Sequence, residues 1–136
     1  MTHMDWAVPP HFADGGAVLC GLILAPEAER AVRPDDRAHI DIEIHGQDPQ
    51  GRSEAALATT DALLKSIDEL KAAAEDLAPG RWRLEYLERP DYSGLFLDGL
   101  EFHDSGTVRA LFDFGDLDLL ILELHPDGRR IASVES

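Results

Sequence analysis

The sequence predicts an α+β domain in which one long helix packs on one face of a mainly antiparallel sheet of about six to seven strands. Three observations support this fold: an apolar strand followed by a clear turn at 117–128, one long amphipathic segment at 53–77, and short alternating segments after it. The predicted element order is ββαβββββ. At 136 residues the chain fits a single domain spanning residues 1–136.

Before the predicted helix, the chain divides into an arm and two strands. Residues 1–16 contain Pro9-Pro10 and Asp14-Gly15-Gly16 without periodicity, which predicts an N-terminal arm ending in a turn. Residues 17–25 are apolar on both parities, as in a strand buried on both faces. Residues 38–45 alternate isoleucines with ionisable residues, which predicts a strand with one packed and one polar face.

Residues 53–77 predict the long helix. Apolar residues recur at helical spacing, namely at Leu63, Ile67, Leu70, Ala74 and Leu77. Pro79-Gly80 then ends the pattern. A helix with one apolar stripe needs a sheet to cover that stripe, and the following segments supply strands for it.

Residues 81–134 predict an antiparallel meander. Apolar and polar residues alternate over 81–86, 95–103 and 107–114, and Asp98-Gly99 is typical of a bulge or a tight turn. Residues 117–124 form the most apolar strand, and His125-Pro126-Asp127-Gly128 predicts a hairpin into the last strand. No internal repeat is evident.

The polar face of residues 38–45 is the first candidate site. Its side chains are of types that bind metals or transfer protons, and we take His39, Asp41, Glu43 and His45 as candidate metal ligands. Residues two apart on a strand lie about 7 Å from one another, whereas His39 and His45 lie about 20 Å apart. A site therefore needs a further ligand from elsewhere, such as His103 or Glu101, and the candidate catalytic residues are Glu43, His45 and His103. The alternative is a solvated strand face without a ligand.

A second cluster of carboxylates, Asp113, Asp116 and Asp118, is the candidate partner-binding site. Its spacing does not match a calcium-binding EF-hand loop, and ordinary turn aspartates are the alternative interpretation. The sequence contains no glycine-rich phosphate loop and no Gly-x-Ser-x-Gly nucleophile motif. No cofactor is predicted, and a divalent metal ion on the strand face stays an open alternative.

The charge limits the class of partner. Asp and Glu number 27 against 12 Lys and Arg, which gives a net charge of −15. Such a surface repels nucleic acid and anionic membranes and attracts basic proteins. A homodimer through the sheet face that one helix leaves uncovered is a further possibility. The sequence shows no secretory signal and no apolar run of membrane-spanning length, so we expect a cytoplasmic location.

These observations favour a non-enzymatic interaction module that engages a basic partner. The general build, a small acidic α+β domain of a bacterial type, resembles uncharacterised domains and toxin-neutralising immunity proteins in architecture, and this resemblance assigns no residue a role. One alternative is a small metal-dependent or acid/base enzyme that uses His39, Asp41, Glu43 and His45. A homo-oligomeric structural domain is the other.

Overall fold

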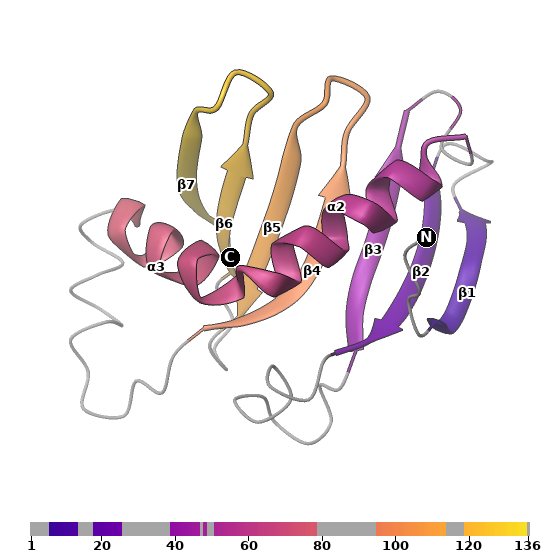
Figure 1. The fold of residues 1–136 in the computed structure, drawn as a ribbon, viewed down its shortest axis with the longest axis horizontal. Helices are drawn as coiled ribbons and strands as arrows, with labels where there is room; N and C mark the ends of the chain where they lie inside the picture. The colour runs from indigo at the N-terminus through magenta and orange to yellow at the C-terminus, as the bar shows by residue number, and fades with distance from the viewer. Residues whose placement is uncertain are drawn as a thin grey trace.

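The computed structural model describes residues 6–13, 18–25, 39–46, 48, 51–78, 95–113 and 119–135. Within them, a seven-stranded sheet carries helices on one face (Figure 1). The strands are β1 (Trp6–Ala13), β2 (Val18–Leu24), β3 (His39–His45), β4 (Phe96–Phe102), β5 (Val108–Asp113), β6 (Leu119–Leu124) and β7 (Arg130–Glu135). The helices are α2 (Ser53–Lys65) and α3 (Ile67–Leu77). The α+β class and the mainly antiparallel sheet agree with the sequence prediction.

The order of the strands in the sheet is their order in the chain, from β1 to β7. All neighbouring strands are antiparallel except β3 and β4, which are parallel. The helical segment lies between these two strands in the chain, and a crossover of this length lets β4 run in the same direction as β3. As a result β3, β4 and β6 all point the same way and end at the same edge of the sheet, namely the edge formed by strand ends and not by an outermost strand.

The predicted single helix at 53–77 is instead two helices separated at Ser66. Ser66 leaves the helical conformation with φ −115° and ψ 32°. Its hydroxyl donates a 3.1 Å hydrogen bond to the carbonyl of Ala62, and such a bond to the preceding turn often bends a helix. Both helices lie across the same sheet face, with α3 reaching β6 and β7 (Figure 1). Neither is both long and apolar enough to cross a lipid bilayer.

The element order also departs from the predicted ββαβββββ, because residues 6–13 of the predicted arm form strand β1. This strand pairs with β2, and its register shifts twice, once between Trp6 and Val8 and once between Val8 and His11, across Pro9-Pro10. Proline lacks the N–H that a sheet requires, which restricts it to edge strands and bulges. The strand predicted at 81–86 lies outside the described residues, whereas 96–135 forms the predicted antiparallel meander of β4 to β7.

The core lies between the sheet and the two helices. The predicted alternation is present in β3, where the three isoleucines are buried and their polar neighbours occupy the other face. Strands β4 to β6 add fully buried side chains, including Leu100, Phe112 and Leu122, and the helices add Ala56, Leu70 and Ala74. The apolar face of β3 thus fixes the direction in which its ionisable residues point.

The sheet face opposite the helices carries ionisable residues on β3, β4, β5 and β6, but it also contains buried apolar side chains. Val18, Phe96 and Ile121 are buried although they do not belong to the core under the helices. Ile121 has no exposed surface and lies between two core residues of β6, so it faces away from the helices. This face is therefore not uniformly solvated, and a homodimer through it stays a prediction.

Candidate metal centre

Three strands of the sheet end in the same three-residue pattern of glutamate, apolar residue and histidine. The tripeptides are Glu43-Ile44-His45 in β3, Glu101-Phe102-His103 at the end of β4 and Glu123-Leu124-His125 at the end of β6, where the last two histidines directly follow their strands. In each, the histidine Nε2 donates a hydrogen bond to the glutamate Oε1, at 3.1, 3.1 and 3.0 Å respectively. Since β3, β4 and β6 point the same way, the three pairs lie along one edge of the sheet.

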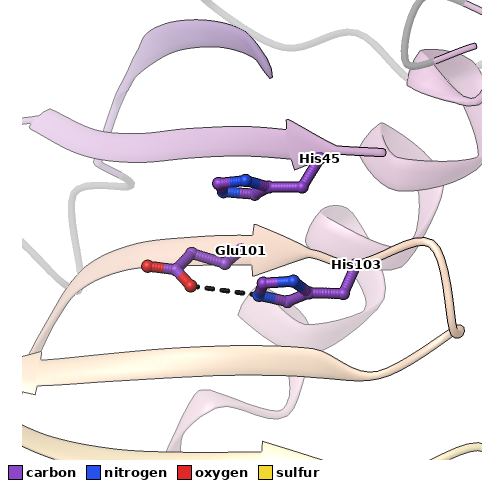
Figure 2. A group of neighbouring side chains, drawn as sticks. All are labelled: His45, Glu101 and His103. Atoms are coloured by element: carbon purple, nitrogen blue, oxygen red, sulfur yellow. Dashed lines mark hydrogen bonds and ion pairs between the residues drawn. The ribbon is translucent and has the colours of Figure 1, made fainter. Parts of the chain in front are cut away.

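The parallel pairing of β3 and β4 places two of these pairs side by side. Glu43 lies opposite Glu101 in the register, so His45 and His103 are also neighbours. Their rings stack with centroids 4.8 Å apart and an interplanar angle of 8° (Figure 2). That spacing is the usual separation of about 4.7–4.9 Å between paired strands, so the backbone register alone accounts for the stacking.

His45, Glu101 and His103 form a group that could hold a metal ion. One ligand atom from each lies within 4.8 Å of the other two, and all three side chains are half-buried. The 3.1 Å between His103 Nε2 and Glu101 Oε1 is close to the separation of roughly 3.3 Å expected for two ligands of a tetrahedral zinc ion. Little movement of these two atoms is therefore needed to bind an ion, and the His45 ligand atom lies within 4.8 Å of both.

Arg109 on β5 holds Glu101 in position. Its Nη1 donates a 2.9 Å hydrogen bond to Glu101 Oε1, and its Nη2 donates one of 2.9 Å to Glu135. Burial lowers the pKa of Arg109, but Glu101 and Glu135 outweigh this effect, so the pKa is raised overall and the guanidinium stays charged. Metal-binding carboxylates are commonly oriented by such an outer partner.

The structure brings together some of the predicted site residues and separates others. The three candidate catalytic residues, Glu43, His45 and His103, lie together, and Glu43 orients the His45 ring. Of the four candidate metal ligands, His45 alone belongs to the His/Glu/His group. His39 pairs with Leu24 at the opposite end of β3, and Asp41 pairs with Gly99.

The candidate partner-binding aspartates are only partly described. Asp113 ends β5 and is 5% exposed, so it offers little surface to a docking protein. Asp116 and Asp118 lie outside the described residues.

The sequence prediction missed Glu123, His125 and Arg109, and it missed the repeat that contains two of them. Residues 101–106 and 123–128 both read glutamate, apolar residue, histidine, two turn residues and glycine. Both form hairpins in which the glycine has a positive φ of 90° or 91° and donates a hydrogen bond to the histidine carbonyl. A six-residue unit is too short to be recognised as a repeat from its length. Its occurrence at the ends of two predicted strands is the signal that could have identified it.

Asp41 lies on the same face, and its surroundings disfavour a charged carboxylate. The stability of the protein should therefore depend on pH through this residue. Partial burial, and then the charges of Asp98 and Glu43, raise the pKa of Asp41 above 3.8. The folded protein therefore binds this proton more tightly than the unfolded chain, so the charged carboxylate lowers stability at neutral pH and the penalty disappears as the pH falls to about 3.8. We expect Asp41→Asn to be more stable than wild type at pH 7, by less than about 1 kcal/mol because solvent screens the group.

Urea unfolding at pH 7 and at pH 3 tests this expectation, since the free energies of unfolding of wild type and Asp41→Asn should become similar at pH 3. Asp127→Asn is a matched control, for which we expect the opposite change in stability. The backbone N–H of Arg129 lowers the pKa of Asp127, so removing that carboxylate should reduce stability at neutral pH. A loss of stability in Asp41→Asn at pH 7 would contradict the assignment.

Comparison with known proteins does not identify this arrangement. No protein family model, curated protein or solved structure matches the chain, so the assignment of the His45, Glu101 and His103 group depends on its geometry alone.

Proposed function

We propose that this protein binds a divalent transition-metal ion through His45, Glu101 and His103. The observation that carries the proposal is the convergence of three ligand atoms within 4.8 Å from neighbouring strands. Two imidazoles and one carboxylate are a donor set that suits zinc and non-haem iron, whereas calcium and magnesium prefer oxygen ligands alone. The parallel register of β3 and β4 holds the donors in place before any ion arrives, which lowers the entropic cost of binding.

The surrounding charge supports the same proposal. Glu43 and Glu123 hydrogen-bond to histidines along this edge, and Glu101 and Glu135 both contact Arg109. Three glutamates, Glu101, Glu123 and Glu135, lie around Arg109 and leave a local excess of negative charge within a chain of net charge −15. A field of this sign raises the local concentration of cations.

A site of three protein ligands favours reactive over purely structural chemistry. Structural zinc sites are usually closed by four protein ligands, whereas a site with three keeps a position for water or substrate. Zinc lowers the pKa of a bound water to about 7, which supplies hydroxide at neutral pH. Glu43 would orient His45, and Arg109 would orient Glu101. The proposal therefore extends to metal-dependent hydrolytic or acid/base chemistry at this edge of the sheet.

The experiment is a calorimetric titration of chelator-treated protein with Zn²⁺, repeated with Co²⁺ while recording its visible spectrum. We expect one ion per chain and a Co²⁺ spectrum of low coordination number. Free metal at about 100 times Kd should raise the free energy of unfolding by about 2.7 kcal/mol. Replacing an outer-shell partner costs about 10–100-fold in affinity, so the double variant His45→Gln/His103→Gln should lose more than about 100-fold.

His39→Gln is the matched control, because it removes the same type of side chain from the other end of the same strand. It should bind Zn²⁺ as wild type does. Equal affinity in wild type and the double variant, or a titration without saturation, would rule out the site.

The charge of −15 favours a second candidate function, a non-enzymatic module that binds a basic protein. This candidate predicts a specific basic protein that is retained from a lysate at low salt and released at moderate salt. Binding of that protein in purified form should weaken with ionic strength and show no turnover. Retention that does not change with salt would contradict this electrostatic mechanism.

A further inference from the structure

A cavity of about 190 Å³ lies between α2 and the ends of β3, β4 and β5. Its floor is apolar and buried, formed by Ile44, Ala56 and Phe102. Polar groups gather on the other walls, where Arg52, Thr59 and Thr107 contribute. Pockets for drug-sized molecules occupy roughly 300–1,000 Å³, so this cavity suits a smaller ligand with an apolar part and a polar part.

Arg52 lines this cavity, and the described residues satisfy its hydrogen-bond donors only in part. Its Nη2 donates a hydrogen bond to the backbone carbonyl of His45. Its Nε is buried and has no hydrogen-bond partner among the described residues. Asp104 is 3.9 Å from Nη2, and its side chain is 56% exposed, so this ion pair is weak. A buried donor without a partner costs free energy, so the protein does not fully satisfy this side chain. Nε is enclosed, but the Arg52 side chain is 31% exposed and lines the cavity, so part of it is accessible to a ligand that accepts a hydrogen bond.

We propose that the cavity binds a small carboxylate, with its acidic group on Arg52 and its hydrocarbon part on the floor. A guanidinium forms charge-assisted hydrogen bonds to carboxylates, and these are stronger than bonds between neutral groups. The floor supplies the apolar contact that a purely inorganic anion cannot use. The cavity is separate from the metal ligands except for His103, which lines it, so the proposal does not require a bound metal.

The test is an NMR titration of chelator-treated, metal-free protein with sodium butyrate, with 1-butanol and sodium chloride as reference titrants. Butyrate should give saturable amide shifts at 52–59 and 103–108. Butanol should bind at least about tenfold more weakly, because it lacks the charge, and chloride should give no saturable shift. Arg52→Gln should weaken butyrate binding by a similar factor, whereas Arg129→Gln, an exposed arginine paired with Asp127, should not.

The comparison of butyrate with butanol needs no variant, so the proposal stays falsifiable if Arg52→Gln does not fold. Equal binding of butyrate and butanol would show an apolar cavity without charge recognition and overturn the proposal. Unchanged butyrate binding in Arg52→Gln would also overturn it, as would the absence of saturable shifts. None of these results depends on whether Zn²⁺ binds to His45, Glu101 and His103.

Discussion

Replacement of Phe112 by alanine is expected to lower the free energy of unfolding by about 3–5 kcal/mol. Phe112 has no exposed surface and lies near the end of β5, opposite Leu97 on β4 and Leu120 on β6. Its ring packs in the core between the sheet and the helices. Truncation loses the burial of the ring and leaves a cavity, because three paired strands cannot close around the gap. Urea unfolding followed by circular dichroism measures the change.

The matched control is Phe12→Ala, which makes the same chemical change on edge strand β1. Phe12 is 51% exposed, so its truncation should change the free energy of unfolding by less than about 0.5 kcal/mol. Similar losses in the two variants would show that the core is not centred on β5.

Replacement of Arg109 by glutamine is expected to lower the free energy of unfolding by about 2 kcal/mol. The guanidinium is 23% exposed and contacts Glu101, which is 16% exposed. Loss of one member of a buried ion pair costs about 3–5 kcal/mol, and we reduce this figure because solvent reaches both groups. Without Arg109, Glu101 and Glu123 face one another across β5 with no cation between them. Thermal and urea unfolding at low ionic strength measure the loss.

Salt gives an independent check on this mechanism. The cost in Arg109→Gln should shrink at high salt, because ions screen the repulsion among the remaining carboxylates. Glu135→Gln is the control, since Glu135 is 58% exposed and exposed ion pairs contribute about 0–1 kcal/mol. A cost in Arg109→Gln that does not respond to salt would point to lost packing of the long side chain instead.

Patterns of local spacing predicted much of the fold. Alternation at residues 38–45 identified β3 and its buried face, because the side chains of a strand point to opposite sides. The helical stripe at Leu63, Ile67 and Leu70 identified the segment that covers the sheet. The Pro126 to Gly128 turn predicted a hairpin, and Gly128 has the required positive φ of 91°. In each case the pattern and the structure that it specifies involve residues close together in the chain.

Features that depend on distant residues were not predictable in this way. The parallel pairing of β3 with β4 joins Glu43 to Glu101, which are far apart in sequence. The break at Ser66 arises from one hydroxyl bonded to Ala62, and a serine on a helix does not always make that bond. Pro9-Pro10 argued against a strand, yet an edge position accommodates both residues.

The candidate site was likewise predictable only in part, because some of its features depend on pairing between distant residues. The sequence identified His45 as a candidate ligand and named Glu101 and His103 as potential partners, but it could not select them over His39 or Asp41. The choice depends on register, since a shift of one residue between β3 and β4 would turn His103 to the opposite face from His45. Arg109 was missed because the sequence did not show that β5 places it between Glu101 and Glu123.

The two prolines of β1 have a consequence for self-association. An edge strand normally offers unpaired N–H and C=O groups on which a second chain can add a strand, the first step of many aggregates. Strand β1 lies at the end of the sheet, lacks two of its N–H groups at Pro9-Pro10 and is irregular on both sides of Val8. Any growth of the described sheet by strand addition is therefore directed to the other edge, at β7.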